Sequence, residues 1–354
     1  MLMDKDMHSC GMYALALAAG IPERDAAIIA YASQFVDDAV NSDSGIHEDG
    51  GLLFGITTAH HPAQSIMSRP KDYHNGLEQQ RKVWVPFHFF PGGRGETFRE
   101  KILCVKDSDI VREMLENHLA IAQKKIYGLE LIGISAHVYA DTFSHYDFSG
   151  MSSPYNDIVG SFEVVIQPAP DVFSYITAKT KKFMANVIGS INGTTTGMLG
   201  HAAVATWPDR PYLNWSFTFT LPRPNNETVS NRDNQATFFE ECEKLHYFFM
   251  RFAKMNYGDA TAKPFDEISP LIKKILAFEG KESERMICWE QSGLVRGMPE
   301  YCPQIWEDQK RVFTELKNSS LGIQSHIYRF HQAAAYHRYY VLKDLLPAHG
   351  IAVY

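Results

Sequence analysis

The sequence predicts a mainly α-helical fold, in which one domain of many helices carries a few short β-strands. Apolar residues recur at helical spacing in several long segments, for example through Ala26, Ile29 and Val36. The chain of 354 residues is 45% hydrophobic and 21% charged, which is typical of a globular protein with a sizeable core. No internal repeat and no Pro- or Ser-rich linker divides it, so a single domain over residues 1–354 is the simplest organisation.

The N-terminal segment is expected to hold two helices followed by a loop. Residues 9–40 are predicted to be helical, with Gly20 suited to the end of the first helix and Pro22 to the first turn of the second. Residues 41–80 are rich in Gly, Ser, Asp and His and are predicted to form a long irregular loop. Loops of this length inside a domain are usually functional or disordered.

The next segment is expected to contain a short extended stretch and then two helices. Residues 82–90 have β-type side chains, although Pro86 restricts any strand there to a sheet edge. Ser108 is placed to cap a helix that runs to about Tyr127. A strongly apolar helix then reaches His145.

The rest of the chain is predicted to hold five helices, one loop and one strand. The loop covers residues 190–200, which are rich in Gly and Thr, and the strand covers residues 215–220, where large side chains alternate. Helices are expected over residues 170–188, 231–256, 263–278, 303–317 and 320–345. We expect the C-terminal helices, residues 230–345, to pack on a functional site built from about residues 1–210.

Charge and cysteine content limit the classes of function. The formal net charge of -7 argues against a protein that binds nucleic acid without regard to sequence, because such proteins neutralise phosphates with Lys and Arg. The five cysteines are far apart and form no Cys-x-x-Cys pair, so neither a disulfide framework nor a thiolate zinc site is expected. The sequence therefore favours a site built from His and carboxylate ligands.

The N-terminus contains a short apolar run, residues 11–20, that could pass for the core of a signal peptide. Asp4, Lys5 and Asp6 precede it and carry no net positive charge, and the run is too short to span a membrane. We therefore expect a buried helix, no signal peptide and no transmembrane segment. The expected location is the cytoplasm, or outside the cell by a route that needs no signal peptide.

The most informative motif places three potential metal ligands on one helix face. His137, Asp141 and His145 are spaced at i, i+4 and i+8, so their side chains point the same way from an α-helix. The surrounding residues are apolar, which predicts that this face is buried and that its polar groups need partners. Imidazole and carboxylate at this spacing are a common zinc-binding arrangement. The ordinary alternative is a hydrogen-bonded polar network in the core.

Further candidate ligands lie elsewhere in the first 210 residues. Each alone is more simply read as a surface turn, a helix end or a core residue, but together with the helical motif they predict a metal site with nitrogen and oxygen ligands. The full set of candidate metal ligands is His8, Asp37, Asp38, His60, His61, His88, His137, Asp141, His145, His201 and Asp209.

This ordered set resembles the superfamily of bacterial zinc-dependent phospholipase C and the fungal and plant zinc-dependent single-strand nucleases, of which the chain would be a divergent bacterial branch. His137 and Asp141 match the His-x-x-x-Asp element of that superfamily. The resemblance implies a multi-helix bundle of the zinc-dependent phospholipase C type, with two or three zinc ions in one site. Other divalent metals would also suit these ligands.

The remaining positions follow the order of the superfamily's ligands. His8 resembles its early His, and Asp37 or Asp38 its first Asp. His60 or His61 resembles the next His. After the His-x-x-x-Asp element, His145 resembles the following His and His201 the late one. Three departures are present: no Trp precedes Trp84, position 205 is Ala where the superfamily has an acid, so Asp209 is the substitute, and His145 follows Asp141 more closely than in the better-known members.

The resemblance also implies roles for these residues in phosphoester hydrolysis. Asp141 would bridge two metals, and Asp37 or Asp38 would orient the attacking water, which makes these three the candidate catalytic residues. Arg210 could contact a phosphate, although a surface ion pair is the simpler reading, and Tyr139 and Phe143 could contact substrate.

The expected substrate is a phospholipid or a small phosphodiester, with transient contact to a membrane surface and no stable binding of nucleic acid. Two alternatives remain open. The first is a single-strand nuclease, which would use aromatic residues near the ligands to stack bases. The second is a metal- or lipid-binding module without catalytic activity, in which protein ligands would close every metal site.

Overall fold

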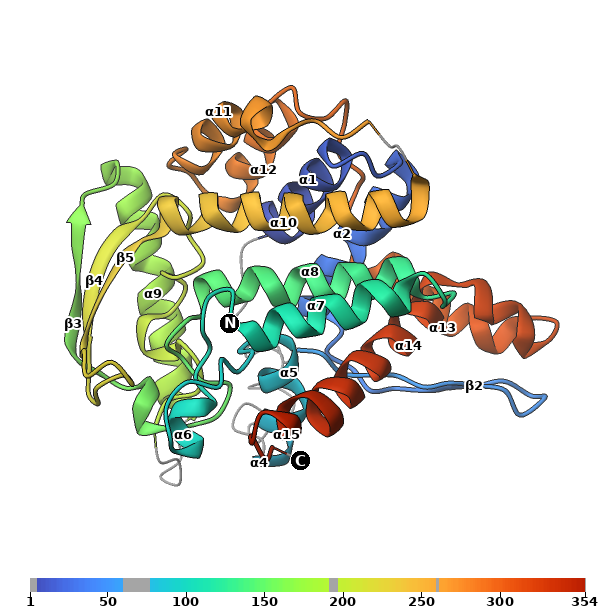
Figure 1. The fold of residues 1–354 in the computed structure, drawn as a ribbon, viewed down its shortest axis with the longest axis horizontal. Helices are drawn as coiled ribbons and strands as arrows, with labels where there is room; N and C mark the ends of the chain where they lie inside the picture. The colour runs from blue at the N-terminus through green and yellow to red at the C-terminus, as the bar shows by residue number, and fades with distance from the viewer. Residues whose placement is uncertain (1–4, 60–76, 191–196, 259–260, 354) are drawn as a thin grey trace.

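The computed structural model describes residues 5–59, 77–190, 197–258 and 261–353, and their fold is mainly helical with small antiparallel sheets (Figure 1). The predicted fold class is therefore confirmed at this level. None of the described helices is long and apolar enough to cross a membrane.

The helix α8 (Gly128–Ser144) lies at the centre of the helical part (Figure 1). It packs against helices from both ends of the chain, which explains why nearly all of its side chains are buried. These neighbours are α2 (Glu23–Asp38), α7 (Asp109–Ala122), α10 (Asn234–Tyr257) and α14 (His326–Tyr339). Helix α8 can therefore present polar side chains only to an interior site.

The N-terminal helices form as predicted. A π-helical turn, η1 (Asp6–Gly11), leads into α1 (Met12–Ala18), which ends just before Gly20, a residue with φ of +88°. Helix α2 then begins after Pro22 and runs to Asp38. Both α1 and α2 bury their apolar faces in the main core.

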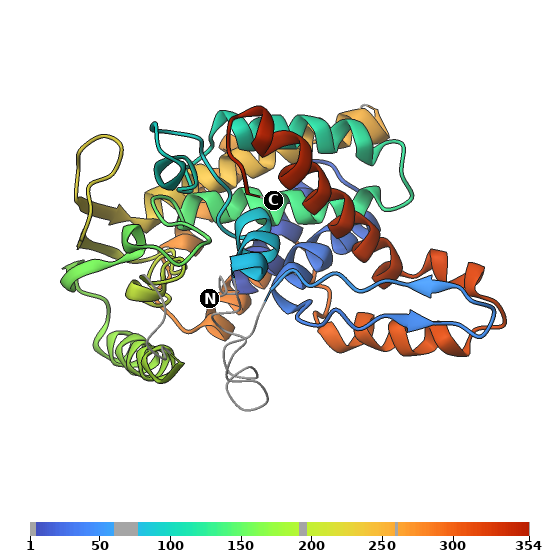
Figure 2. The same ribbon diagram turned by 90° about the horizontal axis from the view of Figure 1, so that it is seen from below.

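The predicted loop over residues 41–80 contains a hairpin in its described part. Two short strands, β1 (Gly45–Ile46) and β2 (Leu52–Leu53), pair antiparallel and lie along α13 (Pro303–Glu315) at one end of the molecule (Figure 2). The chain then returns toward the centre, where Thr58 contacts the end of α2 through a hydrogen bond of 2.6 Å from its hydroxyl to the Val36 carbonyl.

The expected extended stretch over residues 82–90 is wrong. The chain there is helical, through α4 (Leu77–Gln79), the π-helical turn η2 (Gln80–Trp84) and α5 (Val85–Phe87). Pro86 sits in the first turn of α5, where its missing N–H costs nothing, so the residue that limited a strand instead fits a helix start.

Before the central helix, the predicted Ser108 cap is confirmed, and a short capped helix is present that was not predicted. The Ser108 hydroxyl accepts a hydrogen bond of 3.2 Å from the Val111 N–H at the start of α7. Thr97 and Glu100 form a capping box on the short helix α6 (Phe98–Lys101). Between them these caps fix the chain that precedes α8.

A second, smaller layer holds the three-stranded sheet in the order β3-β4-β5, with β4 in the middle. Its strands are β3 (Ile158–Ile166), β4 (Asn214–Phe219) and β5 (Val229–Asp233), with Trp215 opposite Arg232 in the register. The sheet and α9 (Pro170–Ser190) lie together on one side (Figure 1), where Trp215, Phe217 and Val172 share a separate hydrophobic cluster. Only β4 and α9 were predicted from the sequence.

The C-terminal part is helical as expected, and α10 and α14 pack on α8. Helix α12 (Glu282–Glu290) was not predicted. The other elements are α11 (Phe265–Leu276), α13, the 3-10 turn η5 (Ser319–Gln324), the π-helical turn η6 (Tyr340–Leu345) and α15 (Leu346–Ala348); two further short 3-10 turns are η3 (Pro154–Asn156) and η4 (Ala202–Val204).

Candidate metal centre

Helix α8 carries the predicted motif on its buried face. His137 and Asp141 lie within the helix, and His145 is the residue at which it ends. Each is at most 1% exposed. The spacing of four residues keeps them in one row, and side chains from four other parts of the chain meet this row.

Asp141 lies at the centre of a first group of ligands. Its Oδ1 is 3.1 Å from His8 Nε2, and its Oδ2 is 3.1 Å from His88 Nδ1 and 3.4 Å from His137 Nε2. Asp37 approaches the same nitrogens, with its Oδ1 at 3.9 Å from His88 Nδ1 and 4.0 Å from His137 Nε2. Two overlapping sets of three potential ligands result, and both contain His137.

The end of α8 contributes to a second group. His145 Nε2 is 3.2 Å from Asp209 Oδ1, and His201 Nε2 is 3.7 Å from the same oxygen. All three residues are at most 1% exposed. Each offers one ligand atom within 4.8 Å of the others, which is close enough to share one metal ion.

Backbone carbonyls determine which nitrogen of His88 carries a proton. His88 Nε2 lies 2.8 Å from the Thr58 carbonyl oxygen, which can only accept a hydrogen bond, so Nε2 must carry the hydrogen. The Nδ1 of neutral His88 therefore presents a lone pair. That lone pair faces Asp141 Oδ2 at 3.1 Å, with His137 Nε2 at 3.3 Å, an arrangement that a cation between them would stabilise.

The second group repeats this arrangement. His145 donates its Nδ1–H to the His88 carbonyl at 2.8 Å, and His201 donates its Nδ1–H to the Ala205 carbonyl at 2.6 Å. Both Nε2 atoms are then free to act as acceptors, and both face Asp209 Oδ1. Histidines that bind metals almost always donate their other ring N–H to a carbonyl or a carboxylate, which fixes the ring in this way.

The pKa values of His137, His201 and Asp141 favour the ionisation states that metal binding needs. Burial lowers the pKa of His137 to about 3 and that of His201 to about 4, so both rings are neutral near pH 7. Burial also raises the pKa of Asp141, but interactions with His145 and His137 outweigh it and hold that pKa well below its ordinary value. Neutral imidazole and ionised carboxylate are the forms that bind metals.

Two groups show how strongly negative charge accumulates here. Burial raises the pKa of Asp37 well above its ordinary value, and the charge of Asp141 raises it further. Burial lowers the pKa of His145, but Asp141 and Asp209 outweigh that effect and raise it. Without a metal ion, a proton is the only cation that can relieve the crowding of carboxylates in this site.

Aromatic packing holds the ligands in place. The rings of His8 and His137 stack with their centroids 3.9 Å apart, and the ring of Phe89 stacks on His145 at 4.7 Å. Gly200, with φ of +54°, brings the chain so close to Phe89 that a Cβ would lie 2.3 Å from its Cζ. The loop that carries His201 can take this path only with glycine there.

One asparagine fixes the loop that carries Asp209. The Asn234 Nδ2 donates to the carbonyl oxygens of Trp207 and Arg210, each at 2.8 Å, and its Oδ1 accepts from the indole of Trp215 at 3.2 Å. Neither Asn234 nor Thr58 was predicted from the sequence to support the site. Thr58 contributes its backbone carbonyl, and Asn234 binds the backbone carbonyls of other residues. Contacts with backbone carbonyls cannot be recognised from the residue types in a sequence.

The structure separates the two neighbouring candidates Asp37 and Asp38. Asp38 points away from both groups and accepts a hydrogen bond of 2.5 Å from the Tyr301 hydroxyl. Successive helical residues point about 100° apart, so only one of the two can face α8. His60 and His61 lie outside the described residues.

Tyr139 and Phe143 are not brought to the metal ligands. Each is two residues from a ligand on α8, which places it on the opposite side of the helix. The Tyr139 hydroxyl donates to Asp107 Oδ1 at 2.7 Å, and the ring of Phe143 lies 5.4 Å from that of Tyr139 in the main core. The expectation that they contact substrate is therefore corrected.

Arg210 is buried, contrary to the surface position considered for it. It donates to Thr206 Oγ1 at 3.2 Å, and its guanidinium lies 5.6 Å from the ring centre of Tyr175. Arg210 directly follows Asp209, a member of the second group of ligands, in the sequence.

Comparison with known proteins identifies a family but no function. A model described as a family of unknown function, DUF6765, matches residues 3–345. No curated protein and no solved structure matches the chain. The matched range includes every residue of the two ligand groups and extends over nearly the whole sequence. The chain therefore belongs to the DUF6765 family.

Proposed function

We propose that the protein is a metal-dependent phosphoester hydrolase with a zinc site of two or three ions, similar in activity to zinc-dependent phospholipase C. One observation carries the proposal. Five histidines and three aspartates converge in the interior, and backbone hydrogen bonds turn the lone pairs of three of those histidines toward carboxylate oxygens.

The residues fit divalent metals of the zinc type. The first group would be held by His8, Asp37, His88, His137 and Asp141, and the second by His145, His201 and Asp209. All of these donors are imidazole nitrogens or carboxylate oxygens, which zinc accepts and which manganese, iron or nickel accept as well. When bound, such ions supply positive charge that stabilises the phosphate oxygens in the transition state.

Within this proposal, the two aspartates of the first group have different tasks. The two oxygens of Asp141 face different histidines, His8 and His88, so Asp141 could help to hold more than one ion. Asp37 lies farther from the ring nitrogens, at 3.9 and 4.0 Å, which leaves it room to accept a hydrogen bond from a water and orient it toward phosphorus.

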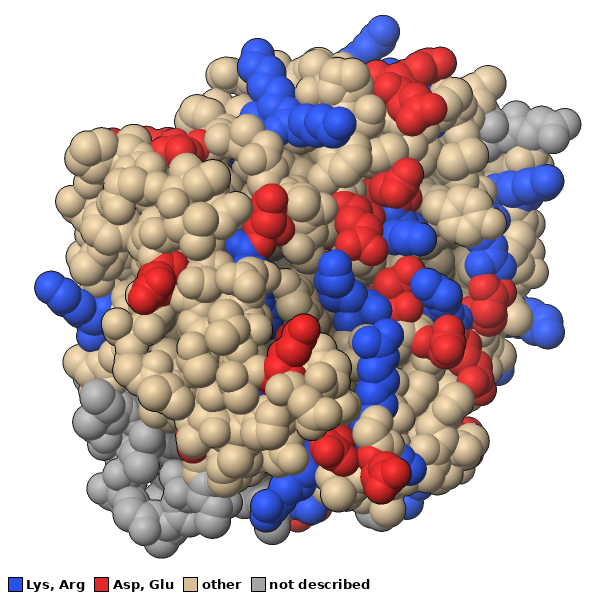
Figure 3. Space-filling view, turned by 60° about the vertical axis from the view of Figure 1, so that its left-hand side comes forward, with Lys and Arg blue, Asp and Glu red and all other residues tan. Residues whose placement is uncertain are grey.

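The surface favours a phospholipid or a small phosphodiester over nucleic acid. On the face shown in Figure 3, Lys and Arg are interspersed with Asp and Glu, and they do not form a continuous basic stripe across that face. The net charge of the chain is -7. A substrate whose recognition depends on one phosphate is more compatible with this surface than a polyanion. Contact with a membrane surface would be transient.

A second candidate function is a non-catalytic metal-binding module. The observation that favours it is the burial of all eight ligand residues, which are 0–1% exposed. A closed site in which protein atoms fill every coordination position stabilises the fold without binding substrate. In that case metal would be present and phosphoester hydrolysis absent.

Metal content and hydrolysis, measured on the same samples, test both functions. We expect wild-type protein purified without a histidine tag to contain two or three zinc equivalents and to hydrolyse p-nitrophenylphosphorylcholine faster than single-stranded DNA. Asp141→Asn should lose metal and activity together. The control Asp107→Asn alters a carboxylate that contacts the other side of α8 through Tyr139, and should keep both.

Each outcome has a definite meaning. Metal without hydrolysis of either substrate would reject the hydrolase and support the closed module. Faster cleavage of DNA would support the nuclease alternative. Protein that neither contains zinc nor takes it up after dialysis would reject every metal-based function.

A further inference from the structure

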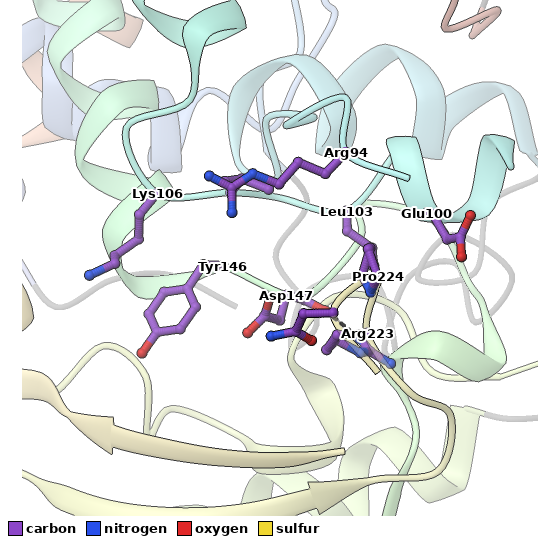
Figure 4. Close-up of a pocket in the computed structure, with 10 residues that line it drawn as sticks. Arg94, Glu100, Leu103, Lys106, Tyr146, Asp147, Arg223 and Pro224 are labelled. Carbon is purple, nitrogen blue, oxygen red and sulfur yellow. Dashed lines mark hydrogen bonds between the residues drawn. The ribbon is translucent and has the colours of Figure 1, made fainter. Parts of the chain in front are cut away.

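A cavity of about 230 Å³ lies outside the metal centre, beside the chain that follows His145. It is bounded by the turn before α6, by residues 103–106, by Tyr146 and Asp147, and by the turn between β4 and β5 (Figure 4). Four separate segments therefore meet at this cavity. Its lining is rich in charged residues, and basic ones predominate.

Arg223 forms part of the cavity floor and is held rigidly. Its guanidinium donates to the carbonyl oxygens of Asp147, Tyr155 and Leu221 at 2.7, 2.9 and 2.9 Å. The residue is 6% exposed, and its Nε has no hydrogen-bond partner among the residues that the structure describes. The groups that accept its hydrogen bonds are neutral carbonyls, which do not compensate its charge.

A second buried arginine lies behind the cavity wall. Arg232 is 1% exposed, donates to the Tyr146 carbonyl at 2.7 Å, and has its guanidinium carbon 3.4 Å from the ring centre of Tyr146. Its nearest carboxylate is Asp147, with Oδ2 3.9 Å from its Nη2. Two buried guanidinium groups thus share a single carboxylate.

Burial and mutual repulsion have a measurable consequence for Arg223. Burial lowers its pKa to about 10; Asp147 acts against that shift and Arg232 adds to it. A buried cation in this situation gains stability when an anion approaches. The floor of the cavity therefore presents a fixed excess of positive charge.

The rim of the cavity adds two more cations. Arg94 is exposed and makes no hydrogen bond or ion pair within the described part of the chain, and Figure 4 shows it across the cavity from Asp147. Lys106 lies 5.5 Å from the ring centre of Tyr146 and pairs with Glu240 at 3.0 Å. Arg94 is thus the cation best placed to bind a ligand directly.

The acidic residue at the rim does not neutralise these cations. The Glu100 carboxylate accepts hydrogen bonds from the N–H groups of Glu96 and Thr97 and from the Thr97 hydroxyl, at 3.0, 2.9 and 2.9 Å. These contacts belong to the capping box of α6 and turn the carboxylate toward its own helix.

We propose that this cavity is a binding site for a small oxyanion, either inorganic phosphate or the phosphate group of a small ester. Arg94 and Lys106 donate hydrogen bonds to its oxygens, and Arg223 and Arg232 supply fixed positive charge from beneath. Arginine favours phosphate because its planar fork matches two oxygens at once. The cavity has room for a phosphate or a short phosphoester but not for a polymer.

Calorimetric titration of the full-length protein at low ionic strength tests the site. Inorganic phosphate and glycerol 3-phosphate are titrated separately into wild type, Arg94→Ala and Arg99→Ala. Arg99 is an exposed arginine on the neighbouring short helix α6 and does not line the cavity, so it controls for the loss of one surface charge. We expect Arg94→Ala to raise Kd about tenfold, and Arg99→Ala to leave it within about twofold.

The outcomes are separable from those at the metal centre. Tighter binding of the ester than of inorganic phosphate would identify an esterified ligand, and the reverse a free anion, provided that Arg94→Ala weakens either. Binding that is equal in wild type and Arg94→Ala would place the anion elsewhere, including at the metals, and would overturn the proposal. Failure of both anions to bind at about 10 mM would also overturn it.

Discussion

Replacing Gly200 with alanine should disturb the second ligand group without altering any ligand. A Cβ at this position would lie 2.3 Å from Phe89 Cζ and under 3.0 Å from both of its neighbours, Cε1 and Cε2. Phe89 cannot yield freely, because its ring stacks on His145 at 4.7 Å and lies 5.8 Å from the ring of His201. The added methyl group must therefore displace Phe89 or the loop that carries His201.

The cost has two separate parts. An alanine held at φ near +54° costs about 1–2 kcal/mol, because its Cβ crowds the following carbonyl. Overpacking against a fully buried ring costs about 1–3 kcal/mol more. The free energy of unfolding should therefore fall by about 2–5 kcal/mol.

A second glycine separates these parts experimentally. Gly160 also has positive φ, +69°, but a Cβ there would have nothing within 4 Å. Gly160→Ala should therefore cost only the backbone part, about 1–2 kcal/mol. Urea unfolding of both variants measures the difference, and metal analysis should show loss of zinc from Gly200→Ala alone.

Equal destabilisation of the two variants would refute the reasoning, because it would mean that Phe89 moves aside without cost. Full zinc content in Gly200→Ala, together with the expected loss of stability, would show that the packing of Phe89 does not position His145 and His201. Either result would separate the aromatic contacts from the metal centre.

Two further predictions concern stability elsewhere in the molecule. Burial lowers the pKa of His118 to about 3 and that of His337 to about 4, so the unfolded chain takes up protons before the folded chain does as pH falls below about 6.5. The free energy of unfolding should therefore drop by up to about 1.4 kcal/mol per pH unit for each histidine, down to about pH 4. Urea unfolding across this range should show a shallower dependence of that free energy on pH for His337→Gln than for wild type. Arg285→Ala removes the two hydrogen bonds, of 2.9 and 2.8 Å, that Asp6 accepts in the core, and should cost about 3–5 kcal/mol by the same assay. Arg112→Ala removes an exposed arginine that pairs with Asp107, and should cost under about 1 kcal/mol; similar losses in the two variants would contradict the role of burial.

The central helix and its ligand row could be predicted because both depend on local spacing. His137, Asp141 and His145 repeat every four residues within an apolar segment, and this pattern is sufficient to place them on one buried face. The same rule would have placed Tyr139 and Phe143 on the opposite face, had it been applied to them as strictly as to the ligands.

Other features depended on contacts that sequence patterns do not record. Residues 82–90 have β-type side chains, yet burial of Trp84 and Phe87 in helical turns overrides that preference. Strand β3 was missed because its exposed and half-buried residues do not alternate regularly, and its pairing with β4 is interrupted by shifts in register. The choice between Asp37 and Asp38 required the orientation of α2 relative to α8.

His88 has an unusual double position between the two ligand groups. Its side chain belongs to the first group, and its backbone carbonyl accepts the hydrogen bond that orients His145 in the second. A shift of the backbone at His88 would therefore turn the rings of both groups at once.

Metal binding to the two ligand groups should consequently be coupled through His88. An ion that fixes His88 in the first group also pre-orients His145 for the second, so the first ion lowers the conformational cost of the next. Uptake should be cooperative, with fully loaded and empty molecules more abundant than half-loaded ones. If the site binds metal as proposed, such a protein would discriminate against partial assembly, and its loading would behave as a single step with respect to metal supply.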